Sequence, residues 1–129
     1  MACVLVPASG AEAAERPIKI VVLGDSLSAG FGLSAEAAFP SRLAVALKPK
    51  DAAVTIANAG VSGDTASAGL DRLDWSVPEG TDAVILELGA NDALRGLDPK
   101  LTKAALDKIL RKLEDRHIAV LLAGMQAPR

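Results

Sequence analysis

Short apolar runs alternate with longer amphipathic segments along the chain, and this alternation limits the folds that it can adopt. Four runs have the length and composition of buried strands, at residues 18–23, 53–57, 82–88 and 117–124. The segments between them predict helices over 36–48, from Ser62 or Asp64 to Leu73, and from Pro99 to Arg116. Strands that alternate with helices through short links form a parallel sheet covered on both faces. The sequence therefore predicts one α/β domain.

The composition agrees with this fold class and argues against several functions. Half of the residues (50%) are apolar and only 2% are aromatic, so Ala, Val, Leu and Ile must build the core. The net charge is −2, with no basic stripe and no series of stacking aromatics, which argues against a nucleic-acid partner. No apolar run approaches the roughly 18 residues of a membrane span. The one cysteine, Cys3, excludes an internal disulfide and a cysteine-rich zinc site.

The first 16 residues differ from the rest of the chain. A short apolar run at 2–7 precedes small residues with an A-x-A-like pattern at 11–13. This order is typical of the end of a secretory signal peptide with its cleavage region, although the basic start is missing. We interpret residues 1–16 as a signal-peptide remnant or a disordered leader and residues 17–129 as the domain. A signal of this kind would place the protein in the periplasm or outside the cell.

Polar residues next to glycines follow three successive strands, at the point where each strand is expected to end. They are Gly24-Asp25-Ser26 after the first strand, Gly63-Asp64 after the second, and Gly89-Ala90-Asn91-Asp92 after the third. In open parallel sheets, ligands bind outside the carboxyl ends of the strands. The three motifs are therefore expected to meet at one rim of the sheet.

This set of groups suits nucleophilic cleavage of an ester. Ser26 is the candidate nucleophile, and an oxyanion could be held by the backbone N–H of Ser26, the backbone N–H of Gly63 and the side-chain amide of Asn91. Taken singly, each group has a plainer interpretation. Ser26 could cap a helix, Gly63 could be an ordinary turn glycine, and Asn91 with Asp92 could form an Asx turn. The combination favours a site.

Three acidic residues, Asp25, Asp64 and Asp92, each lie next to one of these candidate groups. We expect them to support the site by capping turns and accepting hydrogen bonds from loop amides, more than by tuning its chemistry. The serine motif, residues 24–28, is G-D-S-L-S, which differs from the G-x-S-x-G nucleophile elbow.

The stretches VVLGDSLSAGFGLSAEAAFPSRL, NAGVSGDTASAGLDRL and VILELGANDALRGLDP resemble the first three blocks of the SGNH (GDSL) hydrolases. The likeness is strongest to the branch of thioesterase I, lysophospholipase and arylesterase, and it runs from Ile18 to the chain end. It implies a flavodoxin-like three-layer α/β/α sandwich with a five-stranded parallel sheet, a monomer, no cofactor and no metal. It also implies that Ser26 is the nucleophile, that Gly63 and Asn91 complete the oxyanion hole, and that the substrate is a small acyl ester or thioester.

The resemblance further implies a late Asp-x-x-His block that supplies the general base. The sequence contains no such block, and its one histidine is His117. Glu114 precedes His117 at the same spacing, but this pair is expected at the amino end of the fourth strand, out of reach of Ser26. We therefore expect the triad His and Asp, the last strand and the last helix to be absent from this chain, which would show trace activity at most. The alternative is a non-catalytic α/β module that binds an acyl group or an anion.

Overall fold

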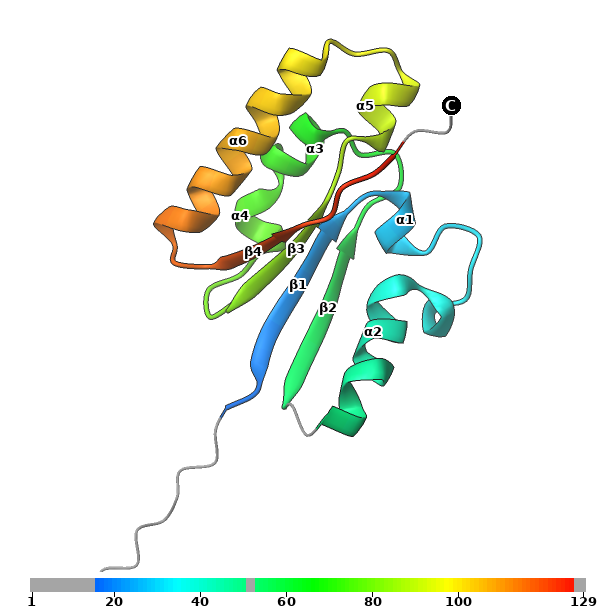
Figure 1. The fold of residues 1–129 in the computed structure, drawn as a ribbon, viewed down its shortest axis with the longest axis vertical. Helices are drawn as coiled ribbons and strands as arrows, with labels where there is room; N and C mark the ends of the chain where they lie inside the picture. Colours follow the sequence, from blue (N-terminus) through cyan, green and yellow to red (C-terminus); the bar gives the residue numbers. More distant parts are fainter. Residues whose placement is uncertain (1–15, 51–52, 127–129) are drawn as a thin grey trace, which may run out of the picture.

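The computed structural model describes residues 16–50 and 53–126, so the leader predicted over 1–16 lies outside it except for Arg16. Within these residues, four strands form one sheet in the order β2-β1-β3-β4 (Figure 1). The strands are β1 (Ile18–Gly24), β2 (Val54–Gly60), β3 (Ala83–Glu87) and β4 (Ala119–Leu122). Each of the three strand pairs is parallel. The predicted parallel α/β architecture is confirmed.

Helices cover the sheet from both sides (Figure 1). The helices α1 (Ser26–Ala29) and α2 (Phe39–Leu47) pack on β1 and β2 from one side. The helices α3 (Ala66–Asp71), α4 (Leu73–Ser76) and α6 (Pro99–Asp115) lie on the other side, and the short α5 (Ala90–Leu94) follows β3. Two 3-10 turns, Ala35–Ala37 and Lys48–Lys50, flank α2. Among the described residues, no helix is long and apolar enough to span a bilayer.

The helices α2 and α6 both have a proline in their first turn. The helix predicted over 36–48 begins later, at Phe39, because Ala35–Ala37 form a separate 3-10 turn. Pro40 is in the first turn of α2, which suits a residue that has no N–H to donate. In α6, Asp98 is the N-cap and its Oδ1 accepts a hydrogen bond from Lys100 N at 2.9 Å, with Pro99 as the first helical residue. This pairing of a capping carboxylate with a first-turn proline is a strong start signal.

The helix predicted from Ser62 or Asp64 to Leu73 begins later and is divided, so this prediction is partly wrong. Thr65 is the N-cap, because its Oγ1 accepts a hydrogen bond from Ala68 N at 3.2 Å. The α-helical geometry is interrupted at Arg72, which ends α3 and precedes α4. Several polar residues near a helix start can each act as a cap, and the local pattern does not distinguish them.

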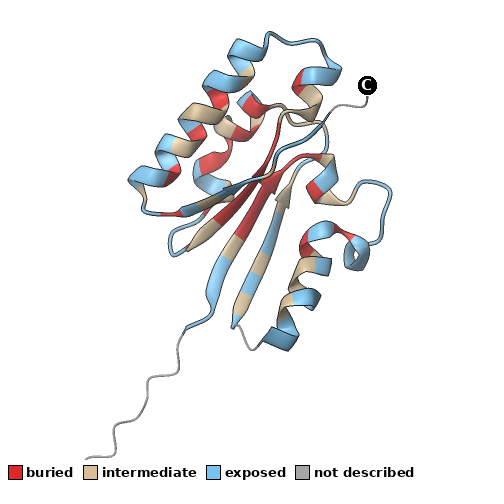
Figure 2. Cartoon of the chain, in the orientation of Figure 1, coloured by how far each residue is buried: buried red, intermediate tan, exposed pale blue. Residues whose placement is uncertain are grey.

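The main core lies between the sheet and the helices α3, α4 and α6 (Figure 2). It contains the following buried residues of these elements: Val21, Leu23, Val84, Leu86, Leu73, Ile109 and Leu113. On α6 the predicted apolar face is confirmed for Ala105, Ile109 and Leu113, whereas Leu101 in the first turn is exposed. The strand β4 is an edge of the sheet as described, and its Leu121 and Leu122 are exposed (Figure 2).

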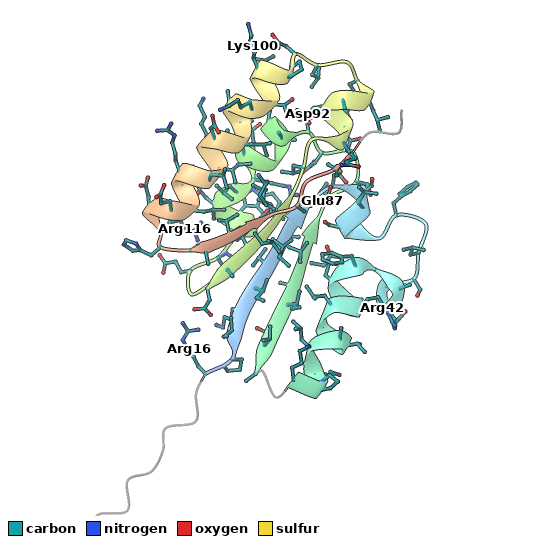
Figure 3. The ribbon with its side chains drawn as sticks, in the orientation of Figure 1. Arg16, Arg42, Glu87, Asp92, Lys100 and Arg116 are labelled. Carbon is teal, nitrogen blue, oxygen red and sulfur yellow. The ribbon has the colours of Figure 1, made fainter. Side chains whose placement is uncertain are left out.

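The amino end of β3 carries an ion pair that should make the fold sensitive to acid. Asp82 accepts two hydrogen bonds from Arg16, at 2.8 and 2.6 Å, and one from Lys19 N at 2.8 Å (Figure 3 labels Arg16). These donors, Arg16 first, lower the pKa of Asp82 from 3.8 to about 2. A carboxyl with a lowered pKa in the folded state contributes stability above its unfolded pKa. That contribution is lost as the pH falls from about 4 to about 2.

The variant Asp82→Asn is therefore expected to flatten the pH dependence of the free energy of unfolding between pH 4 and pH 2. Urea titrations followed by circular dichroism at pH values across this interval measure the slope. Asp107→Asn is a matched control, since Asp107 forms only an exposed pair with Lys103 on α6. An unchanged slope in Asp82→Asn would contradict the assignment.

Candidate active site

The carboxyl ends of β1, β2 and β3 bring the three predicted motifs to one end of the sheet (Figure 1). In the strand register, Gly24 pairs with Gly60 on one side and with Glu87 on the other, so the three strands end at the same level. Asn91 Nδ2 connects the loops that follow, because it donates to Asp25 Oδ2 at 3.2 Å and to Asp64 O at 2.9 Å. The motifs of Ser26, Gly63 and Asn91 therefore meet as expected.

Ser26 is the first residue of α1 and its side chain is not used as a helix cap. That role belongs to Asp25, which is fully buried and whose Oδ1 accepts a hydrogen bond from Leu27 N at 2.9 Å. The plainer interpretation of Ser26 as the N-cap is therefore wrong. Ser26 itself is half-buried, so the residue is partly open to solvent.

The backbone N–H groups of Ser26 and Gly63 have no acceptor among the described residues, and the same holds for neighbouring loop N–H groups such as that of Ser62. Gly63 has φ +89°, a left-handed conformation that favours glycine, and its carbonyl accepts a hydrogen bond from Arg95 Nη2 at 2.7 Å. Unpaired backbone donors can stabilise a developing negative charge when they are aimed at it.

Asn91 and Asp92 lie inside α5, a helix that the sequence did not predict, so the Asx-turn interpretation is wrong. The chain enters α5 through Gly89, whose φ of +119° again favours glycine. Asn91 is half-buried, and both hydrogens of its amide nitrogen are used, the longer bond being the one to Asp25. An oxyanion at this rim would compete with the Asp25 carboxylate for that hydrogen.

Asp92 fixes α5 to two other helices. Its Oδ2 accepts a hydrogen bond from Ala66 N at the start of α3 (2.8 Å), and its Oδ1 accepts one from Thr102 Oγ1 of α6 (2.9 Å). The side chain is buried between these elements (Figure 3). Asp25 and Asp92 thus both bond loop or helix-start amides, as the sequence suggested, whereas Asp64 pairs with a guanidinium, that of Arg72 (Nε to Oδ2, 2.6 Å).

Glu87 lies at the carboxyl end of β3 (Figure 3) and bonds the turn that leads into α1. Its Oε2 accepts a hydrogen bond from Ser28 Oγ at 2.8 Å and one from Asp25 N at 3.3 Å, while Oε1 is buried without a partner in the described part of the chain. Burial raises the pKa of Glu87, and the nearby Asp25 carboxylate raises it further. Sequence reasoning gave no role at the site to Glu87, Arg72 or Arg95. The signal for Glu87 is a second acid, after Asp82, in the otherwise apolar run DAVILEL.

His117 lies at the opposite end of the sheet from Ser26. It follows α6, its N–H donates to Glu114 O at 2.8 Å, and its φ is +56°. The strand β4 begins two residues later at Ala119, so His117 is beside the amino end of a parallel strand. His117 is thus in no position to take a proton from Ser26. Among the described residues, no group of three His, Cys, Asp or Glu side chains could hold a metal ion.

The glycine at the end of β2 allows α1 to lie directly on the sheet. A Cβ at Gly60 would collide with Ala29 N and would lie 2.8 Å from both Ala29 Cα and Ser28 C. These are backbone atoms, so a methyl group can be accommodated only by moving α1.

Gly60→Ala is therefore expected to lower the free energy of unfolding by about 1–3 kcal/mol, the range for an overpacked site. Gly124→Ala is a suitable control, because a Cβ there meets nothing within 4 Å. Urea unfolding of both variants measures the difference. Equal stability of the two variants would show that α1 is not held against β2 in this way.

Comparison with known proteins shows the family of this chain. The model of the GDSL-like lipase/acylhydrolase family matches residues 22–129, which include all three motifs. The chain belongs to this family. Its predicted membership and its α/β fold class are thereby confirmed.

Two curated proteins and one solved structure illustrate the similarity, which covers most of this chain. An arylesterase of Vibrio mimicus is 40% identical over 117 residues, covering 90% of this chain and 58% of the relative. The thioesterase 1/protease 1/lysophospholipase L1 of Escherichia coli (strain K12) is 39% identical over 110 residues, covering 84% and 51%. The crystal structure of AlinE4, an esterase of the SGNH-hydrolase family, superposes with a TM-score of 0.84 at 43% identity, covering 88% and 62%. The chain thus spans 51–58% of the length of these two curated relatives.

Proposed function

We propose that this protein is a serine hydrolase that cleaves acyl esters or thioesters through an acyl-enzyme on Ser26. The observation that carries the proposal is the set of groups at one rim: a half-buried serine at a helix start, two backbone N–H groups without acceptors, and the Asn91 amide. These are a nucleophile and three donors for an oxyanion, contributed by three separate loops. Ester and thioester chemistry is supported by the names of the similar proteins.

The geometry suggests the following steps. Ser26 Oγ attacks the acyl carbon, the carbonyl oxygen becomes negative, and the N–H groups of Ser26 and Gly63 and the Asn91 amide stabilise it. The leaving alcohol or thiol departs with a proton, and water then hydrolyses the ester formed on Ser26. The proton of Ser26 needs a base within hydrogen-bond distance, and His117 lies at the other end of the sheet.

A polypeptide of these 129 residues is therefore proposed to react slowly. In serine hydrolases that lack a triad member, the oxyanion hole and binding alone leave about 1,000- to 10,000-fold acceleration over water. The alternative is a module that binds acyl groups or anions without turnover. The position of His117 beside the amino end of β4, away from Ser26, is compatible with this alternative. Both proposals predict binding at the rim, but only the hydrolase predicts a covalent bond to Ser26.

Covalent labelling with a fluorophosphonate separates these two proposals. The folded chain is expected to form one adduct, located on Ser26 by peptide mass spectrometry, far faster than the urea-unfolded chain does. Ser26→Ala is expected to abolish labelling, while Ser62→Ala, at an exposed serine beside Gly63, is expected to leave it unchanged. Labelling of Ser26 no faster than in the unfolded chain would reject the hydrolase and leave the binding module.

Three further properties of the protein are proposed. The names of the similar proteins support a small-molecule ester or thioester substrate, and the resemblance to the SGNH (GDSL) hydrolases supports a monomer. The signal-like pattern at residues 1–16 supports a location in the periplasm or outside the cell. Fusion of these residues to a reporter enzyme that is active only after export tests the location, and sedimentation tests the oligomeric state.

A further inference from the structure

A buried arginine lies behind the candidate site and outside the set of residues that the motifs single out. Arg72 follows α3 directly, and its side chain is only 8% exposed. A guanidinium keeps its positive charge in proteins, so its burial requires acceptors for its N–H groups. The identity of these acceptors therefore indicates what the side chain does.

Three hydrogen bonds fix the guanidinium, and two of them reach the loops of the site. Nε donates to Asp64 Oδ2 at 2.6 Å, and Nη2 donates to Gly24 O at 3.0 Å. Nη1 donates to Ser76 Oγ of α4 at 3.0 Å. The planar group thus joins the loop after β2 to the end of β1, and anchors both to α4.

The amide of the third loop depends on the same ion pair. Asp64 O accepts the hydrogen bond from Asn91 Nδ2 at 2.9 Å. The contacts that fix the position of Asp64 therefore also fix the position of the Asn91 side-chain amide. Donors accelerate a reaction when they are in place before it begins, and a displacement of about 1 Å can cost about 100-fold. A guanidinium suits this task because its donors have fixed directions, which a lysine ammonium lacks.

We propose that Arg72 is a positioning residue that sets the spacing between the turn of Ser26 and the loop of Gly63, which rests on the function proposed for that rim. It acts through Asp64 and Gly24 O and needs no contact with substrate. A purely structural ion pair would behave differently. Its loss would weaken the whole fold, and every region would open more easily in proportion.

The variants Arg72→Lys and Ser76→Ala separate these two roles. Arg72→Lys keeps a charge for Asp64 and loses the bridge. Its hydrogen-bonded loop amides, Val61 N (to Gly24 O) and Asp64 N (to Val61 O), are expected to exchange with deuterium about tenfold or more faster. Amides of β3 should exchange at rates that follow only the change in global stability, measured by urea unfolding. The rate constant for phosphonylation of Ser26 at saturating fluorophosphonate should fall by about tenfold or more. The probe concentration that gives half of the maximal rate should stay nearly the same. Ser76→Ala keeps both bonds to the site loops and should match the parent chain in exchange and labelling.

The proposal is overturned when the loop amides and the β3 amides of Arg72→Lys accelerate together, or when neither set changes. Asp64→Asn, which keeps the shape of the side chain and removes its charge, is expected to give the same pattern and decides the matter should Arg72→Lys not fold. Hydrogen exchange needs no reactivity at Ser26. If the parent chain is not labelled, the proposed hydrolase function fails, while the exchange pattern still decides the role of Arg72.

Discussion

Asn91→Ala is expected to slow the phosphonylation of Ser26 by about 100- to 1,000-fold, the usual cost of removing one donor from an oxyanion hole. The reason is geometric. The Asn91 amide lies at the rim beside the buried Asp25, and it is the one side-chain donor proposed for the oxyanion. The labelling rate of the folded variant, measured as a function of probe concentration, gives the effect directly.

The matched control for this variant is Asn58→Ala. Asn58 lies in β2, and its side chain accepts a hydrogen bond from Gly60 N at 2.9 Å without a proposed role toward an oxyanion. Its labelling rate is expected to stay close to that of the parent chain. Because Asn91 also bonds Asp64 O, the unfolding midpoint of each variant is measured alongside. A decrease of less than about tenfold in the labelling rate of Asn91→Ala would show that the amide is not part of the oxyanion hole.

Turnover of a p-nitrophenyl ester by a polypeptide of these 129 residues is expected to be about a million-fold slower than by the Vibrio mimicus arylesterase assayed beside it. This is the known cost of losing the histidine of a serine hydrolase. His117→Ala is expected to change nothing, because His117 lies beside the amino end of β4. Rapid turnover that Ser26→Ala abolishes, or a marked loss in His117→Ala, would show that a base is present after all.

The sheet and the long helix could be predicted because their signals are local and repeated. The strands β1 and β3 are apolar runs, and α6 combines the start signal Asp98-Pro99 with an apolar face. The short α5 could not be predicted, because it has five residues and depends on distant contacts. Asp92 bonds both Ala66 N and Thr102 Oγ1, and no pattern within α5 reveals those partners.

The candidate site also has a part that the sequence predicts and a part that depends on distant contacts. The meeting of Ser26, Gly63 and Asn91 follows from the parallel topology, since each follows the carboxyl end of a neighbouring strand. The roles of Arg72 and Glu87 do not follow from any motif. Arg72 bonds Gly24 O across 48 positions of sequence, and Glu87 bonds Ser28 Oγ across 59. Contacts at such separations depend on the completed fold.

A crystal structure of the phosphonylated chain would show whether three loops form one oxyanion hole around Ser26. We expect a phosphoryl oxygen on Ser26 that accepts hydrogen bonds of about 2.7–3.1 Å from Ser26 N, Gly63 N and Asn91 Nδ2. The longer bond from Asn91 to Asp25 should be broken or lengthened in that structure. A phosphoryl oxygen that points to solvent, with Gly63 N and the Asn91 amide unengaged, would contradict the account.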